Sequence, residues 1–306
     1  MRKAGKVLLY TFVILCAVLA LAITFTIGWR PFIGPQARAT TNRQFERTPQ
    51  RLARGRYLVV GLAGCETRHS PKDWTTHGAP NLPGKELSGQ VIPVPGLPGR
   101  VVASNLTPDP ETGSANWTDD ELARSIREGI GHDGRTIFPM MPYSTYRQMS
   151  DEDVTSIVVY LRSIPAVHNA LPPTQVGFPV NYLVRAAPQP VTAPVSGPEV
   201  HDVVQRGKYL ATLGHVASAN ITPDATGISY YDEATFVNAL RTGYVGAQKL
   251  SSIMPFGEFK NLDDDDLKAI FAFLRTLPPV KHRVDNSLPP TYCKVCRQKH
   301  GAGDQN

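Results

Sequence analysis

The residues best suited to chemistry lie in one short segment, Gly64 to Ser70, which reads Gly-Cys-Glu-Thr-Arg-His-Ser. Cys65 and His69 stand four positions apart, so one helical turn would place a thiol and an imidazole on the same face. With a cysteine at Arg68 the segment would read Cys-x-x-Cys-His, the pattern that attaches haem through two thioethers and binds its iron through histidine. The segment therefore predicts a haem contact at Cys65 and His69; the alternative is an ordinary buried thiol beside a hydrogen-bonded histidine.

The composition limits what the rest of the chain can be. Its 306 residues are 42% hydrophobic, too apolar for a disordered chain, and 27 prolines argue against a coiled coil or long-helix bundle. Four cysteines exclude a disulfide-dense scaffold. The net charge of +6 is not gathered into a basic block with interleaved aromatic residues, so no nucleic-acid partner is expected. No nucleophile–base set or nucleotide-binding fingerprint occurs, which argues against an independent enzyme.

The N-terminus predicts a membrane anchor. Val7 to Trp29 is a run of 23 residues without a charge, flanked by Lys6 and Arg30. At about 1.5 Å per residue this run crosses the ~30 Å hydrocarbon core, and it exceeds the apolar run of about 7–15 residues in a secretory signal. Basic residues precede the run, so the N-terminus is expected to stay cytoplasmic and the rest to be exported. Cys16 lies inside this run and is expected to be a membrane-facing thiol.

The exported part contains an internal repeat. Four motifs occur twice in the same order, namely 54–58 with 206–210, 105–109 with 220–224, 141–143 with 254–256, and 160–165 with 273–278. The offset falls from 152 to 115 residues between the first two motifs, so the second half lacks 37 residues there. The missing interval includes the counterparts of Cys65 and His69, and any chemistry in it exists once.

Local patterns place the helices of both halves. A short helix is expected over Arg51 to Leu62, and helices with acidic first turns are expected after Thr118, Ser150 and Asp263. The proline- and glycine-rich stretch 71–99 is expected to be a loop, and 172–198 is expected to link the halves.

From residue 51 onward the chain resembles the membrane-anchored bacterial dihaem cytochromes c, which are similar to the cytochrome subunits of periplasmic alcohol and gluconate dehydrogenases. The matching signatures are Arg54-Gly55-x-Tyr57-Leu58, Asn105-x-Thr107-Pro108-Asp109, Arg127-Glu128-Gly129, Phe138-Pro139-Met140-Met141-Pro142-Tyr143 and Ser150-Asp151-Glu152-Asp153. The resemblance implies that Cys65 is the first thioether cysteine, His69 the proximal iron ligand and Met141 the distal ligand.

Two rivals for the distal position are set aside by the repeat. Met140 and Met149 correspond to an isoleucine and a leucine in the second half, whereas Met141 corresponds to Met254. Arg68 departs from the family pattern, because it stands where the second thioether cysteine belongs. The second half lacks the attachment segment, so it is expected to be a truncated domain without haem.

The C-terminus carries a separate signal. Cys293, Cys296 and His300 supply three metal-ligand types, whereas a closed zinc site needs four ligands. In an oxidising compartment a Cys293–Cys296 disulfide, or a free dithiol, is the competing interpretation.

These observations predict an all-α protein with two cytochrome-c-like domains behind an N-terminal transmembrane helix, the second domain being truncated. The expected divisions are a membrane anchor at 1–30, a linker at 31–50, domain 1 at 51–168, a proline-rich linker at 169–200, domain 2 at 201–282 and a tail at 283–306.

By resemblance, the function is one-electron transfer through a single haem c in domain 1. The partners are a periplasmic dehydrogenase or other electron donor and a respiratory acceptor. The protein is expected in the bacterial inner membrane as a single-pass protein, with its C-terminal bulk in the periplasm. The alternatives are a haem-free docking or assembly subunit, and a metal- or thiol-dependent sensor that uses the C-terminal cysteines.

Overall fold

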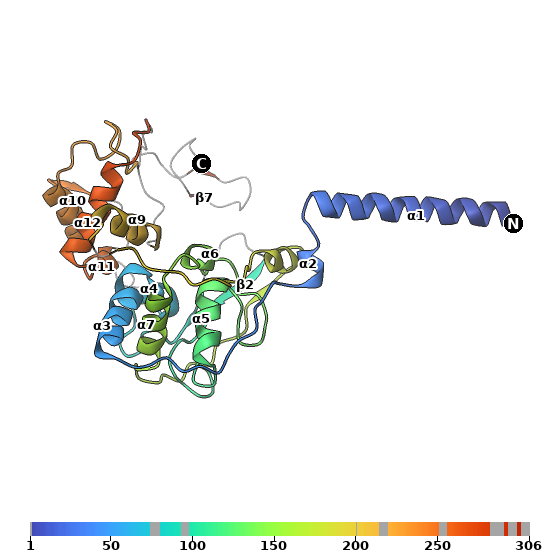
Figure 1. The fold of residues 1–306 in the computed structure, drawn as a ribbon, viewed down its shortest axis with the longest axis horizontal. Coiled ribbons are helices and arrows are strands. Elements are labelled where there is room, and N and C mark those ends of the chain that lie inside the picture. The colour runs from blue at the N-terminus through green and yellow to red at the C-terminus, as the bar shows by residue number, and fades with distance from the viewer. Residues whose placement is uncertain are drawn as a thin grey trace.

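The chain is mostly helical, with 45% of residues in helices and 6% in strands. The computed structural model describes residues 2–73, 80–92, 98–199, 201–213, 220–250, 256–281, 291–292 and 299–300. One long helix projects from a body in which two groups of helices lie against each other (Figure 1). The expected dominance of helices is confirmed, although the all-α expectation missed several short strands.

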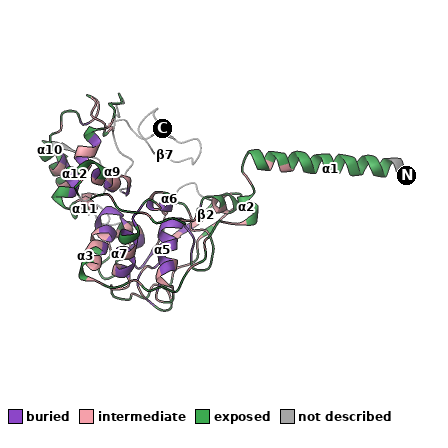
Figure 2. Cartoon of the chain, in the orientation of Figure 1, coloured by how far each residue is buried: buried purple, intermediate pink, exposed green. Residues whose placement is uncertain are grey.

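The projecting helix is α1 (Arg2–Phe25), which has no buried residue between Ala4 and Phe25 (Figure 2). Its Ala4–Phe25 segment has a mean hydropathy of 2.7, so it is long and apolar enough to cross a membrane. A signal sequence can be equally long and equally apolar. A short helix, α2 (Arg30–Ile33), follows it.

The first half of the repeat begins with α3 (Pro49–Tyr57), which continues as a π-helical turn, η1 (Leu58–Leu62), and then as α4 (Cys65–His69). The half is completed by α5 (Asp119–Glu128), α6 (Tyr143–Tyr146) and α7 (Asp151–Leu161). Thr118 and Glu121 form a capping box at the start of α5, and the Ser150 hydroxyl accepts from the Asp153 amide at the start of α7. Both helix starts therefore lie where the sequence predicts them.

Helices α3 and α7 cross at very short range. A Cβ at Gly55 would lie 2.0 Å from the Ser156 carbonyl oxygen, so only glycine fits at this crossing. Arg54 of α3 reinforces the contact, since its Nε lies 2.7 Å from Oδ1 of Asp153 on α7.

A small antiparallel sheet covers one side of this half. Strands β1 (Gln90–Ile92) and β2 (Gly99–Ala103) pair with the register Val91↔Val102, and β2 also pairs with β3 (Gln175–Val176). Strand β1 lies inside the stretch 71–99 expected to be a loop, and β2 begins at the last residue of that stretch. Strand β3 begins the expected linker, which also contains α8 (Val180–Leu183) and a 3₁₀ turn, η2 (Val184–Ala186). The linker is therefore partly ordered against the first half.

The second half repeats the arrangement with fewer elements. It contains α9 (Val203–Leu213), α10 (Glu233–Thr242), α11 (Phe256–Phe259) and α12 (Asp264–Arg275), with a hairpin of β4 (Tyr244–Val245) and β5 (Gln248–Lys249). At the crossing of α9 and α12, a Cβ at Gly207 would lie 1.8 Å from the Ala269 carbonyl oxygen. Gly207 is the repeat counterpart of Gly55, so the motif builds the same close crossing twice. A last hairpin joins β6 (Thr291–Tyr292) to β7 (Lys299–His300).

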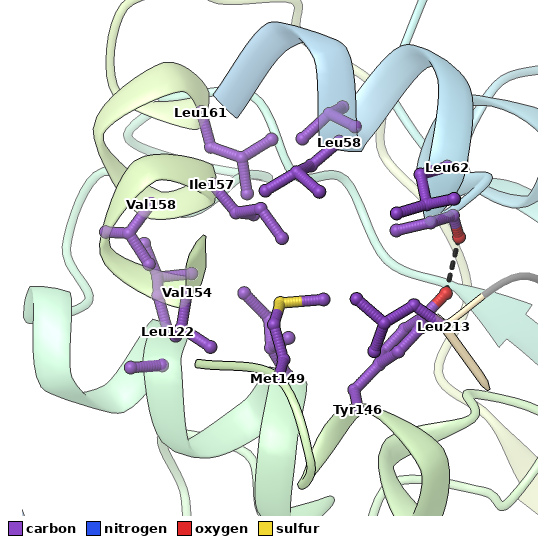
Figure 3. Packing of buried hydrophobic residues seen from close by; sticks show 14 of the residues in the cluster. Leu58, Leu62, Leu122, Tyr146, Met149, Val154, Ile157, Val158, Leu161 and Leu213 are labelled. Carbon is purple, nitrogen blue, oxygen red and sulfur yellow. Dashed lines mark hydrogen bonds between the residues drawn. The ribbon is translucent and has the colours of Figure 1, made fainter. Parts of the chain in front are cut away.

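One hydrophobic core joins the two halves. Leu58, Leu62, Tyr146 and Met149 of the first half share it with second-half residues such as Leu213 (Figure 3). A smaller cluster inside the second half contains Ile228, Phe236, Phe271 and Leu274. The halves are therefore packed together by apolar burial, which is the main stabilising force in such an interface.

A reciprocal set of polar contacts lies at the same junction. Tyr57 of α3 donates a hydrogen bond to Asp266 of α12, and Tyr209 of α9 donates to Oδ2 of Asp153 on α7 over 2.7 Å. Each of these carboxylates also pairs with an arginine of its own half, Arg54 or Arg206. Each half thus contributes one tyrosine and one carboxylate to the junction. The same pair of contacts occurs in both directions, as in an isologous interface.

Candidate functional site

A cavity of about 210 Å³ lies in the first half, and the three residues singled out from the sequence all line it. Cys65 and His69 come from α4, and Met141 comes from the loop before α6. The remaining wall is largely apolar and is drawn from α5, α7 and β2, with Leu122, Ile126, Ile157, Leu161, Val101 and Ala103. The fold therefore gathers a thiol, an imidazole and a thioether around one space.

His69 is held in one orientation and kept neutral. Its Nδ1 lies 2.8 Å from the Ser104 carbonyl oxygen, which can only accept, so Nδ1 carries the proton. The lone pair then belongs to Nε2. The side chain is only 7% exposed, and burial lowers the pKa of His69 to about 4. An imidazole that donates its other N–H to a carbonyl is the usual state of a histidine that ligates a metal.

Cys65 is the first residue of α4, and the turn before it requires a glycine at position 64. Gly64 has φ 58°, in the left-handed region, and a Cβ there would lie 2.8 Å from Oε2 of Glu258 on α11. Tyr146 fixes the preceding backbone by donating to the Ala63 carbonyl oxygen. Burial raises the pKa of the Cys65 thiol to about 12, so at neutral pH the thiol keeps its proton and is a poor spontaneous nucleophile.

The three candidate methionines are separated by packing. Met149 is fully buried among Leu58, Leu122 and Ile157 in the core of Figure 3 and does not line the cavity. Met140 and Met141 both line it. Packing therefore sets Met149 aside, and Met141 differs from Met140 both in the repeat and in its contact with the main hydrophobic core.

Arg68, at the position of the absent second cysteine, lies between the cavity and the second half. Its Nη1 donates to the Gly64 carbonyl oxygen over 3.3 Å, and its side chain lines the cavity. Glu258 approaches the same turn from α11, and burial raises the pKa of Glu258 to about 7 although Arg68 and Lys72 oppose the rise. The turn that carries Cys65 is thus in electrostatic contact with the other half of the repeat.

Three features of the site have no signal in the sequence. The Ser104 carbonyl is a backbone group, which residue type does not reveal, and Glu258 lies far along the chain. Trp117 and His132 stack at the cavity with ring centroids 4.3 Å apart. His132 is exposed, and its ring packs on that of Trp117.

The second candidate site falls largely outside the described part of the chain. Cys293 and Cys296 lie outside the described residues, and so does the side chain of His300. Within the described residues, no group of three or more His, Cys, Asp or Glu side chains could hold a metal ion. Met254, the repeat counterpart of Met141, also lies outside them.

Comparison with known proteins gives this geometry a context. No protein-family model matches the chain. A nicotinate dehydrogenase subunit of Pseudomonas putida is 34% identical over 134 residues, which cover 40% of this chain and 11% of that protein. The cytochrome subunit of fructose dehydrogenase from Gluconobacter japonicus is 26% identical over 266 residues, covering 74% of this chain and 52% of that protein. The cytochrome c subunit of the quinone alcohol dehydrogenase of Gluconobacter oxydans is 25% identical over 281 residues, covering 75% and 55%.

The chain is homologous to dehydrogenase cytochrome subunits. A gluconate 2-dehydrogenase cytochrome c subunit and a diheme cytochrome c are further homologues, all at modest identity. The resemblance stated from the sequence is therefore confirmed. The chain spans about half the length of the fructose and alcohol dehydrogenase subunits that it matches.

Proposed function

We propose that the chain is a c-type cytochrome that carries single electrons through one haem in its first half. The observation that carries the proposal is the meeting of Cys65, His69 and Met141 at one cavity, with His69 already held as a neutral imidazole. The homologous cytochrome subunits support an electron-transfer role. Haem would supply an iron that gains and loses one electron at a potential tuned by the residues that hold it.

The residues present fit this group in their chemistry. His69 and Met141 would hold the haem iron, and Cys65 would hold the haem covalently through a single thioether. Leu122, Ile157 and the other apolar walls would exclude water, which raises the potential of a haem iron. The cavity volume of about 210 Å³ is below the ~300–1,000 Å³ of most ligand pockets.

The second half would hold no haem. It has no counterpart of α4 among the described residues, and its core is filled by aromatic rings. Phe236 and Phe271 correspond in the repeat to Leu122 and Val158, and their centroids lie 5.1 Å apart. Rings therefore take up space at the position where Leu122 borders the cavity of the first half, which avoids the cost of a void.

The protein would work at the bacterial inner membrane. We propose that α1 is retained as a single-pass anchor and that residues 31–306 lie in the periplasm. The electron donor would be a periplasmic dehydrogenase, as the homologous subunits suggest, and the acceptor a respiratory component.

A pyridine haemochrome spectrum of the denatured, full-length protein tests the proposal. The protein is produced in a host that expresses a cytochrome c maturation system. One covalent haem per chain is expected, lost in Cys65→Ala and retained in the matched variant Cys16→Ala. Met141→Leu should shift the midpoint potential and the Soret band, while Met149→Leu should leave both unchanged. Folded protein without covalent haem would refute the proposal.

Arg68 favours one alternative function. Because the second thioether position holds a cationic side chain, a haem-free subunit that anchors or docks a dehydrogenase is the second candidate. Colourless, folded protein that still binds a purified dehydrogenase of the homologous systems would support it.

A further inference from the structure

A patch of exposed apolar side chains lies directly beyond the end of α1. Part of it comes from the residues around α2, where Phe32 is 50% and Ile33 71% exposed, while Pro31 is buried. The other part comes from α8 and the residues just before it, about 150 residues along the chain, where Phe178 is 79% exposed. The exposed members of the patch are Trp29, Phe32, Ile33, Phe178, Tyr182 and Leu183.

The two parts of the patch are in contact. Helix α2 packs against both α8 and η2, which lie beside it in Figure 1. Phe178 and Tyr182 meet edge to face with centroids 6.1 Å apart, and Trp29 and Phe32 meet in the same way at 6.3 Å. The Arg185 guanidinium lies 4.4 Å from the centre of the Tyr182 ring. The patch is therefore an assembled surface of aromatic rings with cations at its edge.

The patch is also fixed to the body of the first half. Strand β3, just before Phe178, pairs with β2, and the Gly177 amide donates to the Pro98 carbonyl oxygen over 2.6 Å. Strand β2 supplies a wall of the cavity through Val101 and Ala103. A partner that binds the patch would therefore also fix the orientation of the cavity relative to that partner.

The residue types of the patch indicate what kind of partner it binds. Contiguous exposed apolar area marks an interaction surface. Aromatic residues with arginines at the end of a spanning helix are typical of the membrane–water interface, where rings sit at headgroup level and guanidinium groups meet phosphates. Arg30 and Arg185 provide those cations, and the patch is continuous with the apolar α1.

We propose that Trp29–Ile33 and Phe178–Arg185 form a second membrane contact, which rests in the headgroup region of the bilayer that α1 crosses. This proposal rests on the retained anchor proposed above. It assigns a role to the segment between the halves, which holds the first half in one orientation at the lipid surface.

Brominated lipids test the contact in the full chain. The protein is reconstituted into nanodiscs of phosphatidylcholine and phosphatidylglycerol, with or without bromine on the acyl chains. Phe178→Trp adds a reporter to the patch, and Tyr230→Trp adds a matched reporter at a residue of the second half that is 66% exposed. The added emission of the first variant should fall at least twofold in brominated discs. The second variant should lose less than a tenth of its added emission.

Two results would overturn the proposal, and they are distinguishable. An intact protein mass that lacks α1 would refute the retained anchor and the contact with it. A full-length mass with an unquenched tryptophan at position 178 would refute the contact alone. Adding Leu183→Asp to Phe178→Trp should restore at least half of the quenched emission, because a carboxylate at the patch opposes its entry into the lipid surface.

Discussion

Replacing Glu258 by glutamine should change how the stability of the protein depends on pH. Burial against Gly64 and Arg68 holds the pKa of Glu258 at about 7, above its ordinary value of 4.5. A carboxyl group with a raised pKa binds its proton more tightly in the folded state. Its contribution to stability is therefore present below pH 4.5 and is lost as the pH rises to 7. A pKa difference of this size corresponds to about 3 kcal/mol in the free energy of unfolding.

His69 works in the opposite direction when no iron is bound to it. Its pKa falls from 6.5 to about 4, so its contribution is present above pH 6.5 and is lost as the pH falls to 4. This difference also corresponds to about 3 kcal/mol. In haem-free protein the two groups nearly cancel between pH 4.5 and 6.5.

Urea unfolding of the full-length protein in detergent, repeated from pH 4.5 to 8, measures the effect. The stability of Glu258→Gln minus that of the wild type should rise by up to about 3 kcal/mol across this range. Glu199→Gln is the matched control, since it makes the same substitution at an exposed residue of the loop before α9. If the Glu258→Gln difference is constant within about 0.5 kcal/mol, the buried state of Glu258 is refuted.

Three further changes test other contacts. Gly207→Ala should destabilise the protein by about 2 kcal/mol or more, because its Cβ would overlap α12, whereas Gly257→Ala, with nothing within 4 Å, should be nearly neutral in the same unfolding assay. Tyr57→Phe and Tyr209→Phe should each cost about 1–2 kcal/mol, since each removes a hydrogen bond to a carboxylate, and Tyr209→Phe should cost the more because its hydroxyl also accepts from the Ser150 amide; no cost in either variant would contradict the reciprocal interface. Arg68→Cys should add a second thioether, read as a shifted haemochrome band and a haem that survives removal of the other cysteine; an unchanged band would place Arg68 away from the haem edge.

The helices could be predicted because their signals are local. The capping residues Thr118 and Ser150, followed by apolar residues at helical spacing, specify α5 and α7 within a dozen residues of sequence. The sheet could not be predicted in this way. Its strands are two to five residues long, and Gly99 pairs with Val176, far along the chain. Such pairing depends on tertiary contacts that a local pattern does not encode.

The candidate site shows the same contrast between residues that local sequence indicates and residues that only tertiary contacts bring in. Cys65 and His69 lie one helical turn apart, so their spacing indicates them. The groups that tune them, the Ser104 carbonyl and the Glu258 carboxylate, reach the site only through the fold. Met149 is the opposite case. Its residue type makes it a candidate iron ligand, but it is completely buried in the core and does not line the cavity.

The repeat itself explains why family motifs persist in a half that lacks the attachment segment. The glycine of Arg-Gly-x-Tyr permits the close helix crossing in each half, and the tyrosine reaches a carboxylate of the opposite half. Asn220 likewise binds the Val280 carbonyl oxygen, as Asn105 binds that of Val167. These residues serve packing and the interface, so their recurrence does not require haem. The single cavity lined by Cys65 and His69 is therefore better support for a haem site than the recurring motifs, because only the first half has both residues.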